Sequence, residues 1–200
     1  MRQMDILMAI GNKVAIVGGA YNPPHQGHIE GCEAVAPLFD EVWMMPCFAH
    51  TFNKKVASSV HRLAMCNLLE FKHKNIKVSS YELDHAITRG TINLLDALSG
   101  SYPTTEFSLV IGEDNAAIIT KWVRYEELIK KYSIVVLPRQ GTFTPQSWYK
   151  TSPHLYLENT KIATVSSTEV RENLKNGIQN MLLPQKVYEY IKKTQCMDGV

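Results

Sequence analysis

The chain has 200 residues, a length that suits a single domain with a substantial core. Hydrophobic residues make up 45% of it and charged residues 20%, and the formal net charge of +2 is too small to indicate a nucleic-acid-binding surface. No apolar run approaches a membrane span, and the four cysteines form no CxxC pair or zinc-type spacing, so we expect buried free thiols and a cytoplasmic location.

Strand-like and helix-like segments alternate along the chain. The predicted strands cover residues 14–17, 41–45, 76–79, 107–111 and 134–137, with short strands at 155–157 and 162–165. The predicted helices cover residues 27–36, 58–71, about 88–98 and 125–131, with two more starting near 167 and 184. This alternation predicts an α/β fold, a doubly wound, Rossmann-like parallel sheet with a small helical C-terminal part. We expect an N-terminal extension over residues 1–12 and one domain over residues 13–200.

Two of the predicted helices rest on particular residues. The helix after Ser58 or Ser59 has apolar residues at helical spacing, namely Val60, Leu63, Ala64, Leu68 and Phe71. That spacing predicts that these residues form its buried face. Thr88 is a candidate N-cap for the next helix.

The most informative stretch follows the first strand. Residues 18–28 read Gly-Gly-Ala-Tyr-Asn-Pro-Pro-His-Gln-Gly-His. Glycines allow a ligand to approach the backbone closely, and the start of a helix offers free N–H groups and a positive dipole end. His25 and His28 would add side-chain donors at the same point. This combination predicts a cradle for a polyphosphate and therefore nucleotide chemistry.

A second anion-binding turn is predicted near residue 166. Ser166 and Glu169 have the spacing of a capping box, which would start a helix. The hydroxyl groups of Ser167 and Thr168 would then lie at the helix N-terminus, with Arg171 one turn further on. Both turns follow predicted strands, as do Gly112, Asp114 and Arg139, so we expect all of them at the carboxyl edge of one sheet.

These two stretches carry a family resemblance. Residues 18–28 resemble the Gly-x-Phe-(Asp/Asn)-Pro-x-His-x-Gly-His signature of the α/β nucleotidyltransferases, and residues 165–171 resemble their Ile-Ser-Ser-Thr-x-(Ile/Val)-Arg signature. The Pro-Pro-His form is typical of the nicotinate/nicotinamide mononucleotide adenylyltransferase family, and the likeness extends from about residue 13 to the C-terminus. It implies transfer of the adenylyl group of ATP to a pyridine mononucleotide, with Mg²⁺ bound through the ATP phosphates.

The resemblance also implies residue roles. The residues that it makes catalytic are His25, His28 and Arg171. The residues that it places around ATP are Gly18, Gly19, Ala20, His25, His28, Arg139, Ser166, Ser167, Thr168 and Arg171. The residues that it places around the mononucleotide are Tyr21, Asn22, Lys54, Lys55, Arg62, Thr91, Gly112, Asp114 and Trp122. No protein-held metal is implied.

Several of these roles have ordinary alternatives. Lys54 and Lys55 would contact a phosphate or simply be solvated, and Arg62 would contact the mononucleotide phosphate or brace the loop before it. Asp114 would bind a ribose hydroxyl or cap a helix. Trp122 would stack on the pyridine ring or belong to the core.

The expected acceptor is nicotinate mononucleotide. Arg89 lies beside Thr91, in the segment that the resemblance places at the pyridine ring, and residues 183–191 are similar to the C-terminal segment of bacterial nicotinate-type enzymes. The alternatives are nicotinamide mononucleotide, another adenylyl- or cytidylyltransferase of the superfamily, and a non-catalytic nucleotide-binding module. ATP and the mononucleotide are the expected partners, without nucleic acid or membrane, and a homo-oligomer stays open.

Overall fold

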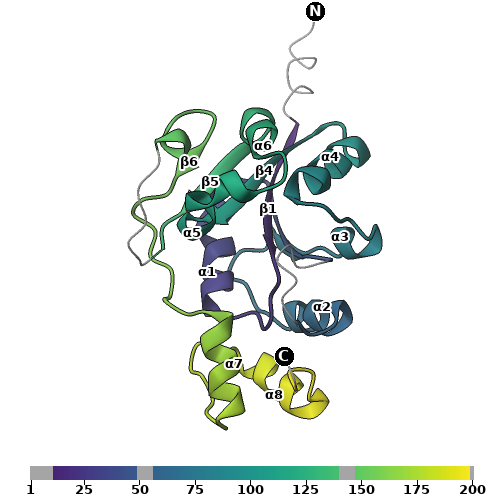
Figure 1. Ribbon diagram of the computed structural model, residues 1–200, viewed down its shortest axis with the longest axis vertical. Helices are drawn as coiled ribbons and strands as arrows, with labels where there is room; N and C mark the ends of the chain where they lie inside the picture. The colour runs from purple at the N-terminus through teal and green to yellow at the C-terminus, as the bar shows by residue number, and fades with distance from the viewer. Residues whose placement is uncertain (1–10, 49–55, 140–146, 199–200) are drawn as a thin grey trace, which may run out of the picture.

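A six-stranded, all-parallel sheet forms the centre of the computed structural model, which describes residues 11–48, 56–139 and 147–198 (Figure 1). The strands are β1 (Asn12–Gly19), β2 (Glu41–Pro46), β3 (Ile76–Val78), β4 (Thr105–Gly112), β5 (Ser133–Leu137) and β6 (Leu155–Tyr156). Their spatial order is β3-β2-β1-β4-β5-β6, with Ile16 of β1 aligned to Trp43 on one side and Leu109 on the other. The order reverses between β1 and β4, and sheets of this kind bind ligands outside the carboxyl ends of the strands at that point.

Helices cover both faces of the sheet (Figure 1). They are α1 (Gln26–Val35), α2 (Ser59–Asn67), α3 (Tyr81–Asp84), α4 (Thr91–Ser101), α5 (Glu113–Ala117), α6 (Tyr125–Lys131), α7 (Ser167–Lys175) and α8 (Gln185–Thr194). Short 3₁₀ turns occur at Ala36–Leu38, Ile119–Lys121 and Trp148–Lys150. The doubly wound α/β fold with a helical C-terminal part is therefore confirmed.

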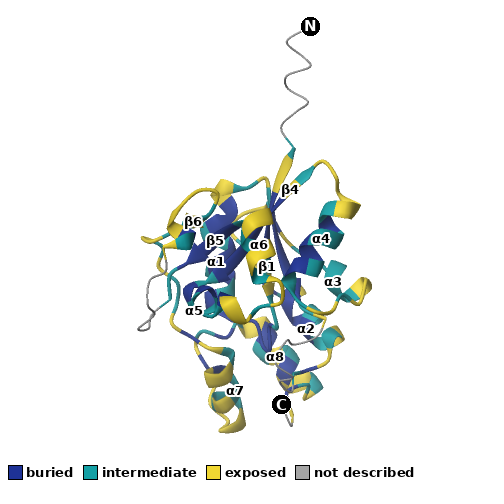
Figure 2. Ribbon diagram, turned by 45° about the horizontal axis from the view of Figure 1, so that its top comes forward, coloured by how far each residue is buried: buried dark blue, intermediate teal, exposed yellow. Residues whose placement is uncertain are grey.

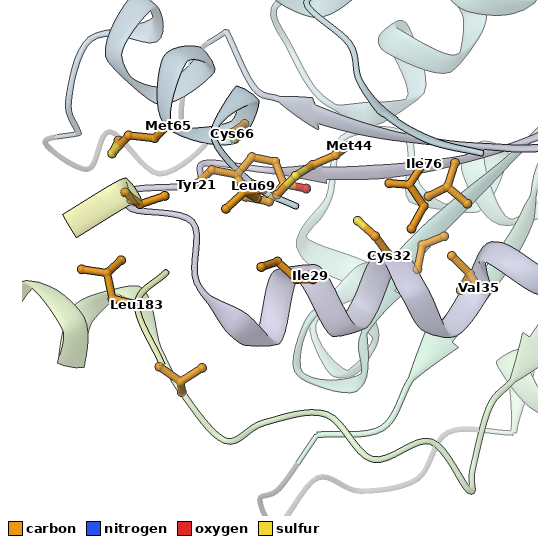
Figure 3. Packing of buried hydrophobic residues seen from close by; sticks show 14 of the residues in the cluster. Tyr21, Ile29, Cys32, Val35, Met44, Met65, Cys66, Leu69, Ile76 and Leu183 are labelled. Carbon is orange, nitrogen blue, oxygen red and sulfur yellow. The ribbon is translucent and has the colours of Figure 1, made fainter. Parts of the chain in front are cut away.

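Alternating strand residues build two separate cores. Ala15 faces a cluster formed with α1, α2, α7 and α8, whereas Val14 and Ile16 face a cluster formed with α4, α5 and α6. In the first cluster, Ile29 and Cys32 of α1 point toward Met44 of β2 (Figure 3). Buried residues are concentrated in the strands and in the helix faces that meet them (Figure 2). A strand buried on both faces needs apolar residues at successive positions, as β1 has.

The face of α2 was predicted wrongly. Val60 is 73% exposed, and the helix instead buries Arg62, Met65 and Cys66. The helix also ends at Asn67, so the apolar residues at positions 68 and 71 pack on the core from the segment after it. The predicted spacing left out Met65 and Cys66, and an apolar pattern cannot anticipate a buried arginine.

Several other segments differ from the predicted elements. The N-cap of α4 is Gly90, not Thr88, because residues 88–89 form a turn whose carbonyls accept from Asn93 Nδ2 at 3.2 and 3.1 Å. Residues 162–165 are not a strand, and the short helix α3 was not predicted. The segment expected to be a loop over 141–153 contains the 3₁₀ turn Trp148–Lys150.

The start of the chain and the state of the cysteines were also predicted from the sequence. β1 already begins at Asn12, so the expected extension ends earlier than residue 12, and residues 1–10 lie outside the described part. All four cysteines are free, with Cys32 and Cys66 buried and Cys47 and Cys196 half-buried. None of the helices described here has the length and apolar character that crossing a membrane requires.

Candidate functional site

Two stacked histidines lie where α1 begins, beyond the carboxyl end of β1. The rings of His25 and His28 stack with centroids 3.7 Å apart and planes 23° from parallel. The backbone N–H of His25 donates to His28 Nδ1 at 3.1 Å. A neutral imidazole has one protonated nitrogen, so this bond places the His28 proton on Nε2. That N–H is available to an acceptor on a ligand.

Both histidines are neutral at physiological pH. Burial, and to a smaller extent the positive charge of Arg139, lower the pKa of His25 to about 4. The pKa of His28 is held well below its usual value by burial, then by His25 and Arg139. Neutral rings that donate N–H groups can hydrogen-bond to a phosphate without carrying a charge of their own.

The start of α7 packs directly against the turn that holds the histidines. Ser167 Oγ donates to the carbonyl of Pro23, 144 positions earlier, at 3.0 Å. Arg171 Nη1 donates to the carbonyl of Asn22 at 2.8 Å, and Nη2 reaches Thr168 Oγ1 at 3.3 Å. The two predicted anion-binding turns therefore form one unit.

The predicted N-cap of α7 is confirmed. Ser166 Oγ accepts the backbone N–H of Glu169 at 3.1 Å. The remaining free N–H groups and the positive dipole end of this nine-residue helix lie beside the histidines, so two helix N-termini converge on one place.

A cavity of about 420 Å³ lies between these elements. His25, His28, Asp114 and Arg139 line it, together with residues 162–167 and Glu169. Asp114 Oδ1 lies 3.7 Å from Arg139 Nε and is buried without a hydrogen-bond partner among the described residues. Asp114 is in the first turn of α5 and not its N-cap, which is Gly112. The carboxylate is thus free to accept a hydrogen bond from a ligand.

The glycines at the strand ends have different roles. A Cβ at Gly112 would lie 2.4 Å from Asp114 Oδ1, so a side chain there would displace the carboxylate. A Cβ at Gly18 would meet nothing within 4 Å, whereas one at Gly19 would lie 3.1 Å from the ring of Tyr21. The backbone at Gly18 faces open space, as close approach of a ligand requires, and the carbonyl of Ala20 is already used internally.

Tyr21 and Asn22 belong to the turn between β1 and α1, and their side chains form hydrogen bonds that stabilise it. Tyr21 is 2% exposed, donates its hydroxyl to the Val17 carbonyl at 2.5 Å and lies edge-on to the ring of His28. Asn22 Oδ1 accepts the backbone N–H of Ala57 at 2.9 Å, while its Nδ2 is buried without a partner in the described structure. Asn22 therefore keeps a free donor, but the side chain of Tyr21 is used in packing rather than exposed to a mononucleotide.

Arg62 has the hydrogen bonds of a brace, one of its two expected roles, and its contact with the mononucleotide phosphate stays a prediction. The side chain is 1% exposed, and Nε donates to Ala57 O at 3.0 Å. Nη1 and Nη2 donate to the carbonyls of Ala20 and Cys47 at 2.9 and 2.7 Å. These bonds join the ends of β1 and β2 to the start of α2, and they hold the guanidinium inside the protein.

The remaining mononucleotide candidates of the described residues, Thr91 and Trp122, do not line the histidine cavity. Trp122 is half-buried and packs against the second core, and it does not line the histidine cavity. Thr91 is the first residue of α4, next to the exposed Arg89. Lys54 and Lys55 lie outside the described residues.

Two glutamates, Glu30 and Glu82, were missed by the sequence reasoning, and the structure gives a role to a third, Glu113. Glu30 of α1 accepts the Ala163 N–H at 2.6 Å and Gln26 Nε2 at 3.1 Å, so it holds the cavity wall at residues 162–165. Glu113 is buried and accepts hydroxyl groups from Tyr149 and Tyr156 at 2.9 and 3.3 Å. The four-residue spacing of Gln26 and Glu30 is visible in the sequence, but the partner 133 positions away is not.

Glu82, the second missed glutamate, lies near Cys47 and Arg62. It accepts the backbone N–H of Phe48 at 2.9 Å. Burial raises the pKa of Glu82 to about 7, against the opposing effects of the Phe48 bond and Arg62. A carboxyl group at the end of β2 is therefore partly protonated at neutral pH.

Comparisons with known proteins agree on one family. Residues 16–173 match the family model described as cytidylyltransferase-like. A protein of Flavobacterium psychrophilum named a probable nicotinate-nucleotide adenylyltransferase is 34% identical over 185 residues, which are 90% of this chain and 95% of that protein. One with the same name from Anaeromyxobacter dehalogenans is 30% identical, covering 96% of this chain and all (100%) of its own length.

Solved structures share the fold. The nicotinic acid mononucleotide adenylyltransferase of Plasmodium falciparum complexed with NaAD superposes with a TM-score of 0.80 at 22% identity, covering 94% of this chain and 98% of its own. The same protein complexed with APC has a TM-score of 0.78 at 21% identity. The likeness extends over nearly the whole chain.

Proposed function

The chain belongs to the nicotinate-nucleotide adenylyltransferase family, within the cytidylyltransferase-like proteins, and we propose that it transfers the adenylyl group of ATP to nicotinate mononucleotide. The 5′-phosphate oxygen of the mononucleotide attacks the α-phosphorus of ATP. The bond between the α-phosphorus and the oxygen that bridges to the β-phosphorus breaks. The products are nicotinate adenine dinucleotide and pyrophosphate, a step of NAD biosynthesis.

The observation that carries this proposal is the direct contact between the two helix N-termini. Ser167 and Arg171 bond to the turn that ends in the His25–His28 stack. Such a site suits a polyphosphate whose negative charge shifts during reaction, because fixed N–H donors stabilise developing charge without reorganising. No protein nucleophile is required, since the acceptor phosphate attacks directly.

We assign roles within this site on the same basis. The His28 Nε2–H is assigned to an oxygen on the α-phosphorus, and Arg139 adds positive charge beside it. The α7 N-terminus with Ser166, Ser167, Thr168 and Arg171 is assigned to the β- and γ-phosphates. The Asp114 carboxylate, whose Oδ1 accepts no hydrogen bond from the described residues, is assigned to a ribose hydroxyl of the mononucleotide.

Mg²⁺ is proposed to enter with ATP. The cavity lining holds two carboxylates, Asp114 and Glu169, and a Mg²⁺ ion prefers six oxygen ligands. Two carboxylates are too few to hold the ion by themselves, so phosphate oxygens and water would be its main ligands. The ion, when bound, would neutralise charge on the phosphates, while the chain's own donors orient them.

Specificity constants for a panel of acceptors test the function. Purified protein is assayed for pyrophosphate release from saturating ATP with nicotinate mononucleotide, nicotinamide mononucleotide and phosphopantetheine. We expect the highest kcat/KM with nicotinate mononucleotide. Higher values with the amide would overturn the acceptor assignment alone. If ATP binds but no acceptor releases pyrophosphate, the chain is a nucleotide-binding module and not an enzyme.

A further inference from the structure

A second cavity lies between α7 and α8, which stand beyond the carboxyl end of β1 (Figure 1). Its volume is about 400 Å³, within the range of small-molecule sites, and it shares no lining residue with the histidine cavity. We call it the α7–α8 groove. Of its lining residues, only Arg171 has a role in the proposed reaction.

Positive charge gathers on the walls of this groove. Arg171 and Lys175 are four residues apart, so they share one face of α7, and Lys192 approaches from α8. None of the ion pairs formed by the described residues involves these three cations. Asp198 also lines the groove and balances only part of their charge. The groove therefore favours an anion.

The remaining walls are apolar. Leu174 is half-buried, and Ile191 and Met197 are 5% and 7% exposed within the same lining. A bare inorganic anion would gain little from these side chains. A ligand with both an anionic end and a flat apolar body would use both kinds of wall, since methionine and branched aliphatic side chains pack well on ring faces.

Arg171 connects the groove to the histidine site. A guanidinium has five N–H donors, and the two bonds to Asn22 and Thr168 use two of them. The other N–H groups are available to a ligand in the groove, while the bond to the Asn22 carbonyl keeps the side chain in contact with the cradle turn.

We propose that the α7–α8 groove is a second binding site of this chain, and that it takes a nucleoside phosphate. The phosphate lies among Arg171, Lys175 and Lys192, and the base packs on Ile191 and Met197. This site lies beside the one where ATP reacts and shares only Arg171 with it.

Titration calorimetry with ADP, which cannot donate an adenylyl group with release of pyrophosphate, tests the proposal. The test variant is Lys175→Glu/Lys192→Glu. The control is Lys130→Glu/Lys193→Glu, which changes the charge equally at exposed lysines that are also in last helical turns but lie outside the groove. The test and control variants therefore lose similar favourable interactions with the helix dipoles.

We expect the wild type and the control to bind ADP at the groove and the test variant to lose that binding by about tenfold or more, because charge-assisted hydrogen bonds are removed. Adenosine and inorganic phosphate should each bind there more weakly than ADP. The proposal is overturned if the test variant and the control give the same ADP isotherms. Thermal melts check folding, and Lys192→Gln replaces the double variant if it melts early. The histidine site contains none of the substituted lysines, so ADP binding there should be the same in all variants. It is fitted as a second, constant binding event.

Discussion

The two ends of the substrate site are built in different ways. Around the histidines and the start of α7, the polar groups expected to bind ATP lie together and line one cavity. On the mononucleotide side, Arg62 is enclosed by three carbonyls, and Trp122 packs partly against the core. Groups presented by helix N-termini point outward by the geometry of the helix. A long side chain points wherever its own protein offers partners, so its role is not decided by its position in the sequence.

Replacing His28 by alanine tests the first region and should have the largest effect. The variant loses a donor that we assign to the reacting phosphate, so kcat should fall by about a hundred- to a thousandfold. Steady-state kinetics measures the loss, and circular dichroism checks that the fold is kept. His73→Ala, an exposed histidine, is the control. A His28→Ala variant that is folded and nearly as fast as wild type would remove His28 from the reaction.

Arg62→Met tests whether Arg62, on the mononucleotide side, stabilises the fold rather than contacting substrate. The change leaves the carbonyls of Ala20, Cys47 and Ala57 without their donors, and the free energy of unfolding should fall by about 3 kcal/mol. Denaturant unfolding measures this, with the exposed Arg89→Met as the control. A direct phosphate contact would instead raise the KM for the mononucleotide and leave stability unchanged, and that result would favour the phosphate contact over the brace.

Trp122→Ala sharpens the same comparison. If half of the ring is free to stack on the pyridine, the KM for the mononucleotide should rise about 5- to 150-fold while that for ATP stays nearly constant. Trp148, which also packs partly against the second core, supplies the matched variant Trp148→Ala. Equal effects of Trp122→Ala on both substrates would show that the tryptophan is structural.

Glu30→Ala should give the smallest effect, and on the ATP side only. Without the bond to Ala163, the cavity wall at residues 162–165 is no longer held to α1, and the KM for ATP should rise about tenfold. Glu30→Gln keeps an acceptor oxygen and should recover most of the affinity. Glu33→Ala removes a glutamate of the same helix that accepts the backbone N–H of Lys72 away from the cavity. Matching losses in the Glu30 and Glu33 variants would mean that Glu30 acts only on stability.

Sequence reasoning was accurate where the interactions that form an element are local, and it failed where they join distant segments of the chain. The strands were found nearly complete because a strand buried on both faces is a local run of apolar residues. The face of α2 was wrong because Arg62, which is almost fully buried, is stabilised by carbonyls of the segments that follow β1 and β2. Residues 162–165 read as a strand because they are apolar, but their backbone N–H partner is a carboxylate on α1.

The sequence by itself determined the α/β order of elements and the two phosphate-binding turns, because glycine, a capping serine and a helix start act within a few residues of one another. Only the tertiary structure decided that both turns meet, that the pKa of His25 falls to about 4, and that Glu30 holds the wall between them. Burial and hydrogen bonds between distant segments exist only after the chain has folded. Their partners, up to 149 positions apart in the case of Arg171 and Asn22, leave no local pattern in the sequence.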